Sequence, residues 1–178
     1  CTTGDGECAI WASGDGSPTC LAAGQQGVHH LVLDDRYVYW SVADGVRRVP
    51  KRGGTLEVLV AERRAVAGLA LADHCLFWSE RYGAIHCLPL ASRKLRTLAD
   101  GQADPGWLAV VDGNLCWACH HWDDGKPAHG TLVALAAGER VPRTVATLSR
   151  HLASFVMDSR DLYWVSGDDA VMTCRVQG

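Results

Sequence analysis

A tryptophan recurs four times along this chain inside the same short pattern, and no other feature constrains the fold as much. Trp40, Trp78, Trp117 and Trp164 follow one another at intervals of 38, 39 and 47 residues. In each repeat a short apolar run leads to a turn that contains Asp, and an apolar or aromatic residue then precedes the tryptophan. A unit that recurs about every 40 residues predicts a repeat architecture in which neighbouring units pack against each other.

Each repeat is predicted to contain four short β-strands. In the second repeat we place them at Leu69–Leu71, Leu76–Ser79, Ala84–Leu88 and Leu95–Leu98, with turn residues between them. The alternating apolar pattern and the short, regular spacing are typical of β-structure, and no segment has a helical period. Four antiparallel strands in about 40 residues form the blade of a β-propeller, so we expect an all-β propeller of about four blades.

Each tryptophan lies in a similar three-residue segment: Tyr39-Trp40-Ser41, Phe77-Trp78-Ser79, Cys116-Trp117-Ala118 and Tyr163-Trp164-Val165. These segments resemble the YWTD-type propeller repeats of low-density-lipoprotein-receptor-like proteins and of many exported bacterial proteins. The resemblance covers nearly the whole chain, and it implies the propeller fold rather than a particular function. The final Asp of the YWTD motif is absent from every repeat, so the bonding network between blades in that family cannot be carried over.

The two ends of the chain are predicted to belong to the propeller. The segment Cys20–Gln25 matches Thr97–Gln102, so the sequence begins with the outer two strands of a blade. It ends, at Val171–Val176, after the third strand of another blade. We expect the N-terminal strand near Thr19–Leu21 to complete the last blade, because closure removes exposed sheet edges. Alternatively, the chain is part of a larger ring of six to eight blades, completed by a second chain or by further sequence.

The predicted domain organisation is a single propeller over residues 1–178. Its parts are the outer strands of a shared blade (1–27), three blades (28–66, 67–104 and 105–150) and a partial blade (151–178).

Composition predicts an exported protein. Eight cysteines in 178 residues are many for a cytosolic chain and indicate an oxidising compartment with disulfides. The start Cys1-Thr2-Thr3-Gly4 looks like that of a mature bacterial lipoprotein, with a lipid anchor on Cys1, although an arbitrary or proteolytic end is the favoured interpretation. We therefore expect a periplasmic, outer-membrane-anchored or extracellular location. The net charge of −3 and the absence of a long apolar run favour neither a nucleic-acid partner nor a transmembrane segment.

The string Cys116-Trp117-Ala118-Cys119-His120 has the spacing of a c-type haem attachment site. In that interpretation Cys116 and Cys119 bind the porphyrin, His120 ligates the iron, and the protein transfers electrons. Trp117, however, occupies the blade-tryptophan position, and residues three apart in a strand point to opposite faces. A disulfide or a pair of buried thiols is therefore the favoured interpretation, with haem and a metal site as alternatives. No cofactor is expected.

The third repeat carries an insertion that predicts the functional face. It is 8 or 9 residues longer than its neighbours, and the excess falls in Cys119–Gly130, between the second and third strands. In a propeller this loop shares one face with the loops that link consecutive blades. His29, His30, His120, His121 and His151 could gather there to hold a metal or an anion. The predicted ligand or partner face consists of His29, His30, Arg63, Trp107, His121, Trp122, Asp123, Asp124 and His151.

The sequence offers no catalytic arrangement. Ser41 and Ser79 occupy a repeated blade position, which indicates a structural role. Asp35, Asp73, Asp112 and Asp158 recur at the first turn of the repeats, where we expect them to bond their own backbone. We expect a non-catalytic binding or assembly module in which a partner protein or a small ligand docks on the loop face, with Trp122 as an aromatic anchor. The alternatives are the electron-transfer protein described above and a metalloprotein or enzyme that uses the His-rich loop. A homo-oligomer that completes the ring is a further possibility.

Overall fold

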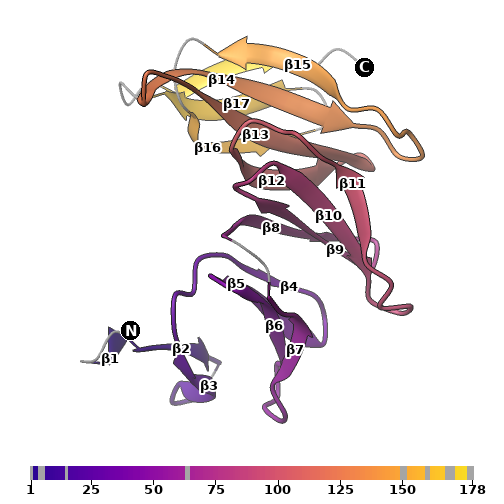
Figure 1. The fold of residues 1–178 in the computed structure, drawn as a ribbon. Coiled ribbons are helices and arrows are strands. Elements are labelled where there is room, and N and C mark those ends of the chain that lie inside the picture. Colours follow the sequence, from indigo (N-terminus) through magenta and orange to yellow (C-terminus); the bar gives the residue numbers. More distant parts are fainter. Residues whose placement is uncertain are drawn as a thin grey trace.

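The computed structural model shows an all-β chain built from five antiparallel sheets that follow one another in chain order (Figure 1). It describes residues 2–3, 7–14, 16–62, 65–148, 152–158, 161–166 and 171–175. Within these ranges no helix is long and apolar enough to cross a membrane.

The three central sheets each have four strands in sequential order, as predicted for blades. Blade 1 consists of β4 (Leu31–Leu33), β5 (Tyr37–Val42), β6 (Gly45–Pro50) and β7 (Glu57–Val60). Blade 2 consists of β8 (Val66–Ala72), β9 (Cys75–Glu80), β10 (Ala84–Pro89) and β11 (Arg96–Ala99). Blade 3 consists of β12 (Pro105–Val111), β13 (Asn114–Asp123), β14 (Lys126–Leu135) and β15 (Arg143–Leu148).

The first and last sheets each have three described strands. The N-terminal sheet contains β1 (Thr2–Thr3), β2 (Glu7–Ala12) and β3 (Thr19–Gln25). The C-terminal sheet contains β16 (Leu152–Met157), β17 (Asp161–Ser166) and β18 (Val171–Arg175).

The recurring aspartates shape the first turn of the blades. Asp73 and Asp112 lie in two-residue hairpins with φ of 47° and 49°, the left-handed geometry that such tight turns need. In blade 1 the turn is longer, and Asp34 accepts hydrogen bonds from the backbone N–H groups of Arg36 and Tyr37 at 2.7 Å each. The prediction of Asp35 as the turn residue of blade 1 is therefore wrong. In this longer turn the carboxylate that accepts the backbone bonds belongs to Asp34.

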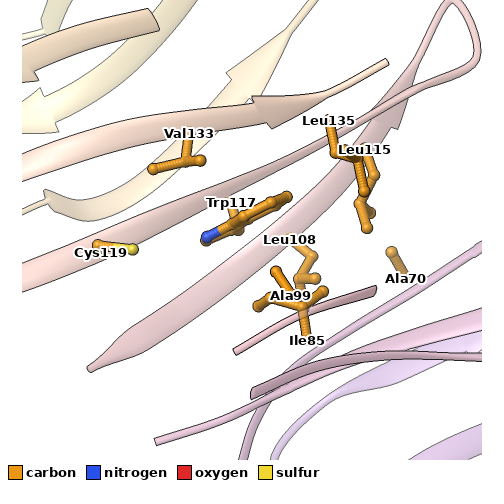
Figure 2. Close-up of a cluster of buried hydrophobic side chains, with 9 residues drawn as sticks. All are labelled: Ala70, Ile85, Ala99, Leu108, Leu115, Trp117, Cys119, Val133 and Leu135. Atoms are coloured by element: carbon orange, nitrogen blue, oxygen red, sulfur yellow. The ribbon is translucent and has the colours of Figure 1, made fainter. Parts of the chain in front are cut away.

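The described residues form four buried core clusters, each between two successive sheets. Trp40, Trp78 and Trp117 are fully buried and pack toward the preceding sheet (Figure 2 shows the Trp117 cluster). Tyr39 and Cys116, each one residue before such a tryptophan, pack toward the following sheet. This alternation follows from the two-residue period of a strand. We call the side with the tryptophan the backward face of a blade, and the opposite side its forward face.

Each buried indole donates a hydrogen bond, and two of the acceptors come from the preceding sheet. The Trp40 Nε1–H bonds to Gln25 Oε1 at 3.3 Å, and the Trp117 Nε1–H bonds to Gln102 Oε1 at 3.2 Å. Gln25 and Gln102 are the last residues of the matching segments Cys20–Gln25 and Thr97–Gln102. Both accept the indole N–H of the next blade, so the two segments are also equivalent in structure. The indole of blade 2 bonds instead to Glu80 of its own strand, at 3.4 Å.

The predicted closure of the last blade by the N-terminal strand is not observed. The strand β3 pairs with β2, for example Ile10 with Ala22, and the described residues show no pairing of β3 with β18. Both β2 and β18 are third strands of a blade, so they compete for the same edge of β3, and β2 occupies it. The N-terminal and C-terminal sheets lie at opposite ends of the row of sheets (Figure 1).

The inserted segment of the third repeat is a hairpin extension rather than the predicted loop. The strands β13 and β14 are 10 residues long, and they stay paired from Cys119 opposite Thr131 to the tip. The tip is the dipeptide Asp124-Gly125, with φ of 46° and 72°, a favoured sequence for a two-residue hairpin turn. The extension therefore carries its side chains on two defined faces.

Candidate functional site

Two adjoining hollows lie where the ends of blades 1, 2 and 3 meet on the predicted loop face. The larger, of about 240 Å³, is lined by Ala67, Arg81, Asp104, Pro105, Gly106, Trp107, His120 and Trp122. The smaller, of about 200 Å³, is lined by His29, His30, Ala43, Ala65, Val66, Ala67 and Arg81. Because Ala67 and Arg81 border both hollows, we treat them as one site and call it the loop-face site.

Trp122 is exposed but held in a fixed orientation. Its Nε1–H donates a hydrogen bond to Asp104 Oδ2 at 3.1 Å, and Arg81 Nη1 lies 3.8 Å from Asp104 Oδ1. The side chain remains 53% exposed. Asp104 thus links the turn of blade 2 to the hairpin extension of blade 3. An indole that is oriented before binding loses little conformational entropy when a partner covers it.

Trp107 is a second exposed indole, 42% accessible, and it is supported by His30. The two rings meet edge to face, with centroids 4.9 Å apart at 87°. The His30 backbone N–H donates to Ser41 Oγ at 3.1 Å. Burial lowers the pKa of the His30 imidazole, and the neighbouring His29 lowers it further, against the opposing effect of a bond to the Ala67 backbone. His30 is therefore a neutral aromatic support at neutral pH.

His120 borders the larger hollow. Its backbone N–H donates to the Ala103 carbonyl at 3.0 Å, which ties β13 to the segment before β12. Its ring lies against Gly106, since a Cβ at that position would be 3.2 Å from His120 Nε2. The glycine makes room for the imidazole at the wall of the site.

The structure brings together some of the predicted site residues. Of the predicted ligand or partner residues, His29, His30, Trp107 and Trp122 border the loop-face site. Arg63 and His151 lie outside the described residues.

The other predicted residues of the extension lie away from the hollows. His121 turns to the opposite side of β13, where its ring stacks on that of His129 at 4.3 Å and its Nε2 lies 3.0 Å from Thr131 Oγ1. His121 and Trp122 are neighbours in β13, and successive residues of a strand point to opposite faces. Asp123 and Asp124 are exposed at the hairpin tip.

Arg81 and Asp104 are central to the site, but the sequence did not single them out as ligands. They lie in different repeats, and their contact depends on the packing of blade 2 against blade 3. Their position could have indicated them, because both residues lie in loops of the face that was predicted to bind a ligand or partner. Among the described residues, no three His, Cys, Asp or Glu side chains converge where a metal could bind.

The haem-like string does not fit covalent attachment of a porphyrin. Cys116 belongs to the buried cluster between blade 3 and the C-terminal sheet, whereas Cys119 belongs to the cluster between blades 2 and 3. The two thiols thus lie on opposite faces of β13 and cannot reach one porphyrin edge. Burial raises the pKa of each thiol to about 11.

The structure describes five cysteine side chains, and all five are free thiols: Cys20, Cys75, Cys87, Cys116 and Cys119. The disulfides that the composition predicted are therefore not formed among these five. Cys20 is exposed, whereas strand alternation buries Cys87, Cys116 and Cys119 in separate parts of the blades.

Iodoacetamide at pH 8 should modify Cys20 of the folded protein and leave Cys116 and Cys119 intact. The thiolate is the reactive form, and the raised pKa of the two buried thiols keeps them protonated and shielded. Peptide mass spectrometry after quenching measures the modification at each site. The same reaction in guanidinium chloride is the control and should label all three. Rapid labelling of the two buried thiols in the folded protein would contradict the structure of β13.

Comparison with known proteins identifies the fold. No protein-family model and no curated protein sequence matches this chain. Among solved structures it is similar to the computationally designed Ika4 protein, with 13% identity over 86% of this chain and 94% of that chain (TM-score 0.68). It is also similar to Kluyveromyces lactis Hsv2p and to the N-terminal domain of Nup159. Both are β-propellers with 14% identity to this chain, and their TM-scores are 0.62 and 0.55.

The chain has a β-propeller fold. The predicted all-β propeller of four-stranded blades is thereby confirmed. The matches cover 88% of this chain and 51% of Hsv2p, and 85% of this chain and 44% of the Nup159 domain. The chain therefore spans about half the length of these natural propellers. The resemblance to YWTD repeats stays a prediction.

Proposed function

We propose that this chain is a non-catalytic module that docks a partner protein on the loop-face site. The observation that carries the proposal is the pair of exposed, oriented indoles, Trp107 and Trp122, on the rim of a hollow that also contains Arg81. Trp and Arg are the residue types that most often dominate the binding energy of protein interfaces. The rigid sheets below the site keep these side chains in place before a partner arrives.

The lining of the site favours a protein partner. The larger hollow, of about 240 Å³, has the exposed indoles of Trp107 and Trp122 in its wall, beside Arg81. Exposed Trp and Arg side chains that border one hollow are typical anchors of a protein interface. Such a hollow suits one or two side chains that project from a partner's surface.

The fold comparison gives general support. One matched solved structure is described as S. cerevisiae Dbp5 bound to Nup159, Gle1, IP6 and ADP, so the matched chain belongs to an assembly of several proteins. Export of the present chain stays a prediction from its cysteine content. The electron-transfer and metalloprotein alternatives lack a supporting arrangement among the described residues.

A phage-displayed library of random peptides would test the proposal. We expect peptides selected on the wild-type protein to bind the Trp122→Ala variant at least about 30-fold more weakly, the loss typical of a hot-spot tryptophan. Trp11→Ala is the matched control, because Trp11 is also exposed but lies on the N-terminal sheet. Isothermal titration calorimetry with synthetic peptides gives the dissociation constants.

Two results would reject this function. One is that no peptide is enriched on the wild-type protein. The other is that the enriched peptides bind the Trp122→Ala and Trp107→Ala variants as tightly as wild type, since the indoles would then not be the docking residues.

A further inference from the structure

We propose that the C-terminal sheet of one chain packs on strand β4 of a second copy of this chain. This contact lies on the faces of the blades and is separate from the loop-face site. It would join two chains through the same kind of interface that holds successive blades together within one chain.

The first observation is that β4 is uncovered. Leu69 of β8 and Leu108 of β12 pair with the tryptophans of their blades and are buried, whereas the equivalent Leu31 of β4 is 49% exposed. Leu33, two residues further along β4, is 57% exposed. The backward face of blade 1 therefore ends in two exposed leucines on its innermost strand.

The N-terminal sheet explains this exposure. Its residues Ile10 and Ala22 pack against Val38, Trp40 and Val49, which lie on β5 and β6. Because β2 and β3 correspond to the outer strands of a blade, they cover the outer part of blade 1. Among the described residues no strand lies at the inner position of that sheet, next to β4.

The second observation is the uncovered forward face of the C-terminal sheet. Tyr163 precedes the blade tryptophan, as Tyr39 and Cys116 do in blades 1 and 3. Those two residues are fully buried, whereas Tyr163 is 36% exposed. Val156 of β16 is 65% exposed, although the equivalent Ala70 of β8 is buried.

The two exposed surfaces are the two halves of the interface that recurs within the chain. Between blades 1 and 2, the forward-face residue Tyr39 and the inner-strand residue Leu69 belong to one buried cluster. Repeating this arrangement places Tyr163 of one chain against Leu31 of the other. Both residues are apolar at the contact and exposed within a single chain.

A second pair follows from the next position along the inner strands. Between blades 2 and 3, Ala70 and Val110 pack in the same cluster. The equivalent positions in the proposed contact are Val156 and Leu33. These are the most exposed members of the two surfaces, and contact between them would remove both from water.

A second copy can occupy β4, whereas the chain's own C-terminal sheet cannot in this structure. The C-terminal sheet lies at the far end of the row, beyond blades 2 and 3 (Figure 1). Every copy carries both surfaces, so two copies can form two equivalent contacts and close on themselves. The match with Hsv2p covers 51% of the Hsv2p chain, so two copies of the present chain together have about the length of one Hsv2p propeller.

Light scattering coupled to size exclusion, together with sedimentation equilibrium, tests the proposal. The wild-type protein should be a dimer of about twice the 19.2 kDa chain mass. The variants Leu33→Lys and Val156→Glu should each be monomers, with the dissociation constant raised at least about 100-fold, because each would bury an unpaired charge. Val141→Glu is the matched control, since Val141 is an exposed valine outside the proposed contact, and this variant should remain a dimer.

A mixing experiment separates contact between chains from closure within one chain. When the Leu33→Lys and Val156→Glu variants are combined, one contact of the mixed dimer pairs Lys with Glu and the other is wild type. The mixture should therefore regain the dimer. Circular dichroism should show unchanged folds, because both side chains are exposed in the single chain.

Three results would overturn the proposal. A wild-type protein that stays monomeric at high concentration has no such contact. A dimer that persists in either charged variant uses another surface. Monomers that do not combine on mixing, while both variants remain folded, would show that the two surfaces do not meet in trans.

Discussion

Replacing Trp117 with alanine should lower the free energy of unfolding by about 3–5 kcal/mol, the range for removing a fully buried large aromatic side chain. Trp117 is inaccessible to solvent and lies between Leu108, Val133 and Ile85, so it fills the space between blades 2 and 3 (Figure 2). The substitution also leaves Gln102 Oε1 without its indole donor. Because most domains are stable by only about 5–15 kcal/mol, we expect a large shift of the urea midpoint.

The matched control is Trp122→Ala in the same strand. Trp122 is exposed, and its hydrogen bond to Asp104 lies near the surface, so its loss should change stability by about 1 kcal/mol or less. Urea denaturation followed by circular dichroism measures both variants. If both substitutions had similar small effects, blade packing would not depend on the repeated tryptophan.

Much of the fold could be predicted because its core repeats from blade to blade. Trp40, Trp78 and Trp117 recur because the same contact between blades recurs, and strand alternation then assigns the residue before each to the opposite face. A contact that recurs in every blade requires the same residue types at the same positions of every repeat, so it can be recognised in the sequence. The match between the segments that end in Gln25 and Gln102 has the same origin, since both glutamines bond the next blade's indole.

The site was predictable only in part, because its contacts cross between repeats. Trp107 and Trp122 were assigned to the correct face from the order of the strands. The bonds of Asp104 to Arg81 and Trp122 depend on how closely two blades approach, and no local pattern encodes that distance. The stacking of His121 on His129 depends on the register of the hairpin, in which these two residues pair, and the sequence does not reveal that register.

The inner strands β8 and β12 approach each other closely at two glycines, and a side chain there should destabilise the fold. Gly68 of β8 faces Gly106 of β12, and a Cβ at position 68 would overlap the Gly106 carbonyl oxygen and lie 2.7 Å from Leu108 Cδ1. That carbonyl also accepts the Ser79 hydroxyl at 2.6 Å, a bond from blade 2 to blade 3. Gly68→Ala should therefore destabilise the fold by at least about 2 kcal/mol.

Two other glycines provide a graded comparison in urea denaturation. Alanine usually gains about 0.4–1 kcal/mol over glycine by restricting the unfolded chain. Gly14→Ala should show this gain, because nothing lies within 4 Å of the new methyl group. Gly106→Ala should be intermediate, since its neighbour is the His120 ring, a side chain that can turn.

The effect of Gly68→Ala should extend to the loop-face site. A methyl group at position 68 displaces the backbone at Gly106, and Trp107 is the next residue along the chain. Peptides that bind through the two indoles should therefore bind this variant more weakly, although it removes none of their contacts. Gly14→Ala should bind them as wild type does. Equal stability of the Gly68→Ala and Gly14→Ala variants would mean that β8 and β12 lie further apart than the structure has them, and the rim of the site would then be less firmly placed.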